Sequence, residues 1–215
     1  MRLTQLPKHS RLTRKSCALK PTTYGNGKAR HRILCPTQWA LPKISWDQAY
    51  GTANPRYFTK VAILDTGVDA THPDLTGVVT AGYSVIDGSN GLTDENGHGT
   101  WLAGIVAART DNQQGIAGIG YDHVQVMPVK VLSADGLGQD SDIIQGIIWA
   151  ADNRASVILM AFSNPGFSDA LQDAIDYAWA QIPPPTPMRL RSTSTTRTER
   201  LRVWMDSRIG RARPT

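Results

Sequence analysis

The stretch from Lys60 to Ala108 constrains the fold more than any other part of this 215-residue sequence. Its apolar run Val61–Leu64 has the length of a short buried strand, and it ends on Asp65, which is followed by a Thr-Gly turn signal. Further along, His98 stands between two glycines and opens a helix of small and apolar residues. An acid at a strand end and a histidine at a helix start lie where open α/β sheets place their sites. The stretch therefore has the layout of a catalytic site.

Strands and helices alternate along the rest of the central region. Three extended segments are expected: Val78–Ile86, Val124–Leu132 and Ser156–Ala161. The helix opened by His98 runs to about Ala108, and further helices begin near Asp140 and at Ser168. The core-facing stripes of these last two helices are Ile143, Ile144, Ile147, Ile148 and Ala151, and then Leu171, Ala174, Ile175, Ala178 and Trp179. Such alternation predicts parallel strands joined by right-handed crossovers.

The net charge of +5 averages three unlike regions. Residues 1–46 carry ten Lys or Arg and no acid, residues 47–181 carry five basic and sixteen acidic residues, and residues 182–215 carry eight Arg and two acids. The central domain is thus expected to be acidic. Clustered arginine is a footprint of nucleic-acid binding, but neither end has a recognisable reader motif, so no nucleic-acid partner is expected. No apolar run approaches 18 residues, so no membrane partner is expected either.

The segment around the Asp and the His resembles the subtilisin-like serine proteases, in particular thermitase-like subtilases. The resemblance is carried by LDTG at 64–67, HPDL at 72–75 and NGHGT at 96–100. It implies a serine endopeptidase whose chain order is Asp, His, Ser, the order known from subtilisin itself. Asp65 would then hold the Nδ1 hydrogen of His98, and His98 would act as general base toward a serine. The implied substrate is a polypeptide in extended conformation.

The resemblance implies an α/β fold, a parallel doubly wound subtilisin-like sheet with helices on both faces, here truncated before its C-terminal half. We expect residues 1–34 to be a basic, disordered arm and 35–181 to be a partial peptidase domain, ordered from near Gln38. Residues 182–215 are rich in Pro, Arg, Ser and Thr and are expected to be disordered or out of frame. A secreted location is implied too, although no signal peptide is visible. Cys17 and Cys35 have neither disulfide-framework nor metal-ligand spacing.

The serine nucleophile and the oxyanion-hole asparagine of the family are both missing from this sequence. No GTSMA-like segment is present, and the last asparagine, Asn164, precedes the final helix. Loss of the nucleophile costs about 10⁶-fold in rate in subtilisin itself. The chain alone is therefore expected to be inactive. The alternative is a non-catalytic peptide-binding remnant or an unfolded fragment, since the edge of the Ser156 strand would lack cover.

Two segments correspond to the family's substrate-binding positions. Gly136, Leu137 and Gly138 would pair with the substrate backbone by strand addition; the alternative is a Gly-rich turn before a helix. Ala161, Phe162 and Ser163 stand where the family has the SLG wall of the specificity pocket. Trp101 is a further departure, because subtilisins often have a second histidine there.

A structural calcium site is also implied by the resemblance. The side chains would be Asp74 and Asn112, with main-chain oxygens from Arg109, Gln114 and Ile116. The N-terminal segment offers His31 where the family adds another carboxylate. A metal hydrolase using Asp65, His72 and His98 is a weaker interpretation, because no ligand set such as HExxH is present.

Overall fold

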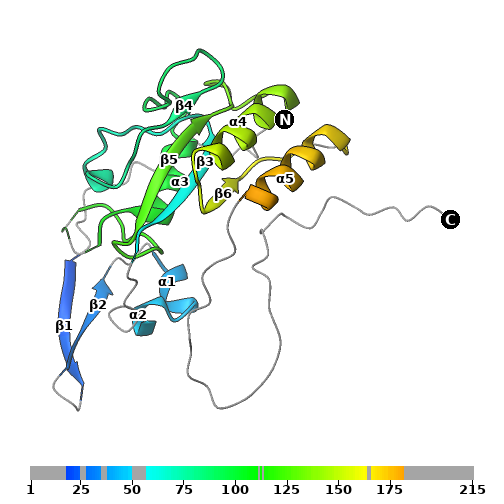
Figure 1. The fold of residues 1–215 in the computed structure, drawn as a ribbon. Coiled ribbons are helices and arrows are strands. Elements are labelled where there is room, and N and C mark those ends of the chain that lie inside the picture. The colour runs from blue at the N-terminus through cyan, green and yellow to red at the C-terminus, as the bar shows by residue number, and fades with distance from the viewer. Residues whose placement is uncertain are drawn as a thin grey trace, which may run out of the picture.

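A parallel sheet of four strands forms the centre of the computed structural model, which describes residues 18–24, 28–34, 38–49, 57–110, 112, 114–163 and 166–181. The strands are β3 (Thr59–Asp65), β4 (Tyr83–Ser84), β5 (Val124–Lys130) and β6 (Val157–Met160), in the spatial order β4-β5-β3-β6. All three pairings are parallel. The strand that ends on Asp65 is therefore flanked by β5 and β6. Because the strands are parallel, their carboxyl ends lie at the same edge of the sheet (Figure 1).

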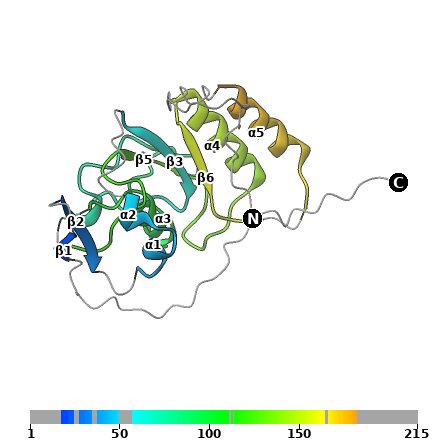
Figure 2. The same cartoon turned by 90° about the horizontal axis from the view of Figure 1, so that it is seen from below.

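Helices cover both faces of this sheet, as the doubly wound prediction required. On one face α3 (His98–Ala107) packs Ala103 and Ala107 against Val61 and Ile63 of β3. On the other face α4 (Asp140–Asp152) and α5 (Asp169–Gln181) lie over the side of β3 that carries Leu64 (Figure 2). Because successive strand residues point to opposite faces, one short apolar run serves two cores.

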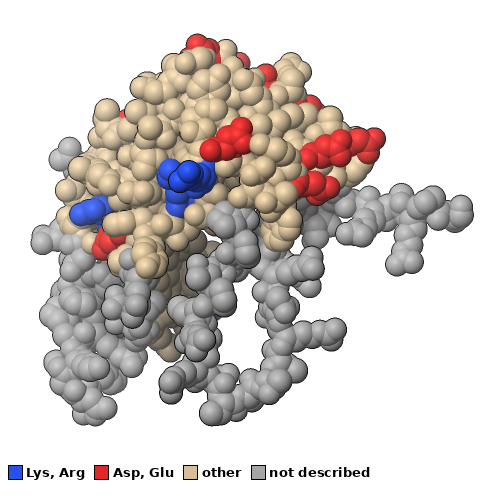
Figure 3. All heavy atoms as spheres, in the orientation of Figure 1, with Lys and Arg blue, Asp and Glu red and all other residues tan. Residues whose placement is uncertain are grey.

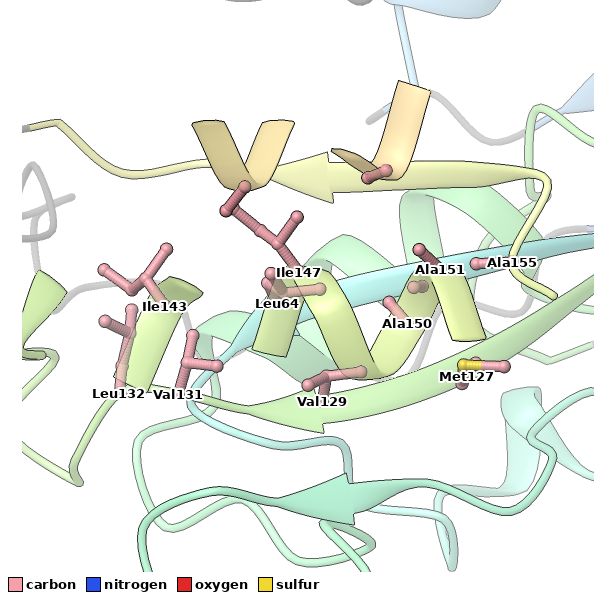
Figure 4. Close-up of a cluster of buried hydrophobic side chains, with 13 residues drawn as sticks. Leu64, Met127, Val129, Val131, Leu132, Ile143, Ile147, Ala150, Ala151 and Ala155 are labelled. Carbon is pink, nitrogen blue, oxygen red and sulfur yellow. The ribbon is translucent and has the colours of Figure 1, made fainter. Parts of the chain in front are cut away.

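The larger core lies between the sheet and α4. Figure 4 shows Leu64 of β3, Val129 of β5 and Val131, which directly follows β5, directed toward Ile147 and Ala150 of the helix. All five are 1% exposed or less, so this cluster provides the apolar burial that holds the α4 crossover on the sheet. Asp65 follows Leu64 and points to the opposite face, toward α3.

The extended segment expected over Val78–Ile86 is shorter in the structure. Only Tyr83–Ser84 forms a strand, and Val79 makes an isolated parallel bridge to Val126. The Val126 N–H donates to the Val78 oxygen at 2.9 Å, so even-numbered residues of β5 direct their N–H groups to this side. The next such residue is Pro128, which has no N–H to donate. The ladder is interrupted there for that reason.

The two later helices begin close to the expected positions. The Ser168 hydroxyl accepts a hydrogen bond from the Leu171 N–H at 3.3 Å, as predicted for an N-cap, and α4 follows Gln139. The prediction that Trp179 and Ile148 face the core is wrong, because they are 47% and 37% exposed. In α4 the exposed residues are Ser141, Gln145, Ile148 and Asp152, so Ile148 lies on the narrow stripe of that helix that remains exposed. In α5 the buried residues are Ala174 and Ala178, on one narrow side of the helix.

The N-terminal region holds more regular structure than the expected disordered arm. Strands β1 (Ala18–Tyr24) and β2 (Lys28–Leu34) pair antiparallel, and a Gly-Asn-Gly sequence, a hairpin signal, separates them. The rest of residues 1–34, both cysteines and the 182–215 tail lie outside the described residues.

Two short helices follow, α1 (Ala40–Lys43) and α2 (Trp46–Ala49). The indole N–H of Trp46 donates to the Ile119 oxygen at 2.9 Å, and its ring stacks on Tyr121 with centroids 4.9 Å apart. The side chain of Gln38 donates to the Ala117 oxygen at 2.8 Å and accepts from its N–H at 2.9 Å. This segment is therefore fixed to the turn that precedes β5.

Acidic side chains gather over α5 on the face seen in Figure 3. Asp169, Asp173 and Asp176 of that helix are exposed, in keeping with the acidic central region of the sequence. No helix within the described ranges is both long and apolar enough to cross a bilayer.

Candidate active site

Asp65 is the last residue of β3 and its side chain is fully buried. Its Oδ1 accepts a hydrogen bond from the Thr66 N–H at 2.8 Å. The main-chain oxygen of Asp65 accepts from Val131 and Leu132, so the end of β3 is tied to the end of β5. The carboxylate is thus held in one position at the carboxyl edge of the sheet.

His98 is the first residue of α3 and follows Gly97, whose φ of 93° lies in the left-handed region that glycine adopts at little cost. The His98 Nδ1 atom lies 2.9 Å from Oδ1 and 3.0 Å from Oδ2 of Asp65. An ionised carboxylate only accepts, so Nδ1 carries the hydrogen and Nε2 is left as the basic nitrogen of the neutral ring. This is the tautomer that a general base requires.

The environment of Asp65 acts on its protonation in opposite directions. Burial raises the pKa of the Asp65 carboxyl above its ordinary value and is the largest effect. The hydrogen bonds from the Thr66 N–H and from His98 oppose it, as does the charge of a protonated His98 ring. Burial thus disfavours the charged form of the Asp65 carboxyl, whereas its hydrogen bonds favour that form.

The structure also shows a second layer of polar contacts that sequence reasoning missed. Asp94 accepts hydrogen bonds from the hydroxyls of Thr66 and Thr100, at 2.7 and 2.6 Å. These residues follow Asp65 and His98 closely in the chain. The sequence offered one signal, an Asp shortly before a helix, which is a residue type enriched at helix starts. That signal does not indicate that the Asp94 side chain contacts Thr66 at the end of β3.

A buried lysine of β5 also contacts this turn. The Lys130 ammonium, 6% exposed, donates to the Thr66 main-chain oxygen at 2.9 Å and to the Glu95 carboxylate. The bond from Lys130 is the main reason why the Glu95 pKa lies below its ordinary value. Lys130 therefore joins the turn after Asp65 to the loop before His98, through a hydrogen bond to the first and an ion pair with the second.

Both candidate substrate segments lie at the carboxyl edge of the sheet, one on each side of β3. Gly136, Leu137 and Gly138 follow β5, in a turn where the Ser133 N–H donates to the Leu137 oxygen at 2.8 Å. The Asn96 side chain donates to the Ala134 oxygen at 2.6 Å, which ties this turn to the His98 loop.

The second candidate segment, Ala161, Phe162 and Ser163, follows β6. The Phe162 side chain packs against the core between the sheet and α4, so it has a packing role whether or not it lines a pocket. Trp101 is 55% exposed on α3, which leaves a large part of its ring outside the core. The substrate roles of both segments remain predictions.

The five residues expected at a calcium site do come together around Asp74. The Asn112 side-chain N–H and the Ile116 N–H donate to the Asp74 carboxylate, both at 2.7 Å. The Arg109 N–H donates to the Asp74 main-chain oxygen at 2.9 Å, and the Gln114 N–H donates to Asn112 Oδ1 at 3.0 Å. In the ranges the structure describes, no group of three or more His, Cys, Asp or Glu surrounds a common point.

Within the described residues, no hydrogen bond joins His72 to Asp65 or His98, as the metal-hydrolase interpretation would require. His72 is exposed and precedes the short 3-10 helix η1 (Pro73–Leu75), where its Nδ1 accepts from the Asp74 N–H at 3.2 Å. It therefore acts as a helix cap. Both hydrogen bonds of the His98 ring within the described part of the chain go to Asp65.

The described part of the chain is thus an α/β protein with a carboxylate and an imidazole in contact at the carboxyl edge of a parallel sheet. Comparison with known proteins shows the family to which such a chain belongs. Residues 58–192 match the Subtilase family, so the chain belongs to that family. The match begins inside and ends eleven residues beyond the 35–181 domain expected from the sequence.

Three similar proteins illustrate the relationship. The chain is 41% identical over 135 residues to a thermophilic serine proteinase of Bacillus sp. (strain AK1), covering 63% of this chain and 32% of that protein. It is 40% identical over 135 residues to thermitase of Thermoactinomyces vulgaris, covering 63% and 46%. A crystal structure of a cold adapted subtilisin-like serine proteinase aligns with a TM-score of 0.51 at 31% identity, covering 60% and 46%. The chain thus spans about half or less of these relatives' lengths.

Proposed function

We propose that this chain carries the acid and base half of a serine endopeptidase site of the subtilisin type. The contact of Asp65 with His98 Nδ1 at 2.9 Å carries this proposal. Asp65 holds the ring in one tautomer and stabilises its charged form, and His98 removes a proton from a serine hydroxyl and then gives it to the leaving amine. The substrate would be a polypeptide bound in extended form beside Gly136, Leu137 and Gly138.

The chain alone is proposed to be inactive in proteolysis. The sequence holds no GTSMA-like serine segment, and no hydroxyl is bonded to the His98 ring among the residues that the structure describes. An Asp–His pair without a nucleophile has no group to acylate. Secretion, which the family resemblance implies, belongs to the same proposal.

A peptide-binding remnant is the second candidate function. It is favoured by the ordered turn after β5, which lies at the carboxyl edge and is held by the Asn96 side chain through Ala134. Such a protein would bind an extended peptide without cleaving it. Binding of an extended peptide to the chain is therefore measured beside the cleavage experiment below.

We also propose weak calcium binding at the Asp74 loop. The Asp74 carboxylate is 3% exposed, and neither ion pair found within the described ranges involves it, so a cation would balance its charge. Carboxylate, amide and main-chain oxygens are the ligands that Ca²⁺ takes. Both Asp74 oxygens now accept from N–H groups, and the set has one carboxylate, so we expect a dissociation constant of about 10⁻⁴ to 10⁻³ M.

A fluorophosphonate probe and a casein digest test the proposal together. The full chain is incubated with each, next to its His98→Ala variant and a complete subtilase as positive control. We expect no labelled serine and no digestion from the chain, with labelling of the complete enzyme. A serine labelled in the chain but not in His98→Ala would overturn the inactivity. If the probe labels no serine of the chain and the chain nevertheless binds an extended peptide tightly, the peptide-binding remnant is favoured.

A further inference from the structure

Asp94 lies outside the Asp65–His98 pair, yet it accepts hydrogen bonds from both segments that carry the pair. Its Oδ1 accepts from the hydroxyl of Thr66, the residue after Asp65, at 2.7 Å. Its Oδ2 accepts from the N–H and the hydroxyl of Thr100, at 2.9 and 2.6 Å. We propose that Asp94 is a positioning residue for the His98 ring. The inference rests on the proposed function, because it concerns the same pair.

The main chain that leads into α3 is held by the same carboxylate. The Asp94 Oδ1 atom accepts from the N–H groups of Asn96 and Gly97 as well, at 3.2 and 2.9 Å. Both oxygens of Asp94 therefore have at least two donors. Because His98 comes directly after Gly97, these bonds fix the direction in which its side chain leaves the helix.

The Thr66 hydroxyl is the link between Asp94 and Asp65. It lies 2.7 Å from Asp94 Oδ1 and 3.2 Å from Asp65 Oδ1, and it has one hydrogen to donate. The shorter distance assigns that hydrogen to Asp94, so Asp65 keeps Oδ1 available for His98. Without Asp94 the hydroxyl would turn to Asp65 and compete with the imidazole for the same oxygen.

Thr100 completes the link on the helix side. Its hydroxyl donates to Asp94 and accepts from the Asp69 N–H at 2.9 Å, in the turn after β3. The Gly99 N–H donates to the Thr66 hydroxyl at 3.2 Å. The first turn of α3 is thus bonded to two residues that follow Asp65, Thr66 and Asp69, and Asp94 accepts from each of the two threonines.

A purely structural role for Asp94 predicts a different result from a positioning role. A helix cap adds to the free energy of unfolding but leaves the His98–Asp65 bond unchanged in molecules that remain folded. A positioning residue changes that bond in the folded state. The Nδ1–H resonance of a histidine bonded to a carboxylate appears at low field, so NMR separates the two roles.

The experiment uses the full chain with ¹⁵N-labelled histidine, and His98→Gln assigns the signal among the five histidines. The variants are Asp94→Asn, Asp94→Ala, Thr66→Val and the conservative Thr66→Ser. Asp87→Asn is the matched control, since Asp87 is an exposed loop acid that accepts from the Ser89 N–H at 2.9 Å. All spectra are recorded well below the unfolding temperature of each variant.

We expect one Nδ1–H tautomer with a low-field signal in the unchanged chain, in Asp87→Asn and in Thr66→Ser. The signal should be lost or broadened in Asp94→Asn, Asp94→Ala and Thr66→Val. A low-field signal that persists in folded Asp94 variants would overturn the positioning role. If the Asp94 variants do not fold, Thr66→Val decides: an unchanged signal there, or unfolding of that variant too, counts as a structural role and contradicts the inference. Absence of the signal from the unchanged chain would instead contradict the Asp–His pair and the proposed function.

Discussion

Gly99 lies so close to Gly67 that a Cβ at position 99 would overlap the Gly67 carbonyl oxygen. The same Cβ would lie 3.2 Å from the Cβ of Asp65. This contact lets the first turn of α3 approach the end of β3. We expect Gly99→Ala to separate the two and to lower the free energy of unfolding by about 1 to 3 kcal/mol, the usual cost of overpacking. Urea unfolding measures this.

Gly104 is the matched control for that substitution, because it lies in the same helix without a close neighbour. Its added Cβ would meet only the Ile116 Cδ1 atom, at an ordinary 3.5 Å. Gly104→Ala should raise the free energy of unfolding by about 0.5 to 1 kcal/mol, since alanine is the better helix former. A loss of stability in Gly104→Ala as large as in Gly99→Ala would show that helix crowding, and not the Gly67 contact, is responsible.

The two partners of the Lys130–Glu95 ion pair should contribute unequally to stability. Lys130→Met leaves the Thr66 oxygen without its buried donor, and we expect a loss of about 1 to 3 kcal/mol. Glu95→Gln should cost about 0 to 1 kcal/mol, and less at high salt, because the Glu95 side chain is 58% exposed. Urea unfolding at low and high salt provides the comparison, and equal losses would contradict it.

The Glu95 contribution also has a defined pH dependence. Its pKa is lowered from 4.5, so its stabilisation is present above that ordinary value and disappears as the pH falls through the folded-state value. The difference in stability between the unchanged chain and Glu95→Gln should therefore shrink in acid. If this difference in stability grows as the pH falls, the lowered pKa of Glu95 is contradicted.

The contribution of Asp65 to stability should have the opposite pH dependence, because burial raises its pKa above 3.8. A group with a raised folded-state pKa favours folding below its ordinary value, and this contribution is lost as the pH rises through the folded-state value. Asp65→Asn does not titrate, so its stability relative to the unchanged chain should increase with pH over that window. Thermal unfolding at several pH values measures this. A relative stability that falls as the pH rises would contradict the raised pKa.

Calcium should raise the unfolding temperature through the Asp74 loop. At a concentration tenfold above the dissociation constant, a single site adds about 1.4 kcal/mol. Magnesium at the same concentration serves as the control for ionic strength, and Asp74→Asn removes the carboxylate. We expect a rise with calcium in the unchanged chain and none in Asp74→Asn. Equal unfolding temperatures in calcium and magnesium would contradict the site.

Local patterns allowed the strands, the helices and their parallel order to be predicted from the sequence, and the resemblance to subtilases implied the Asp65–His98 contact. The run that ends on Asp65 and the glycines around His98 are each signals within a few residues, and strand–helix alternation implies the parallel order. The catalytic role of the pair stays a prediction. What the structure adds is that the two side chains are in direct contact.

Features that depend on distant partners could not be predicted in the same way. The length of β4 is limited by Pro128, which lies on another strand, and the exposure of Trp179 depends on what covers α5. Asp94 accepts from Thr66, 28 residues earlier in the chain. Each of these is a tertiary effect that overrides a local pattern.

The most direct test of the central claim is the rate of a chimera that supplies the missing serine. Residues 1–181 are joined to the C-terminal part of the thermophilic serine proteinase of Bacillus sp. (strain AK1), and kcat for a peptide substrate is measured. We expect the folded chimera to cleave the peptide. His98→Ala should lower kcat by about 10⁶-fold and Asp65→Asn by about 10⁴-fold, the sizes known for the matching residues of subtilisin itself. A folded chimera that is inactive, or one whose kcat is unchanged by His98→Ala, would contradict the assignment of this pair.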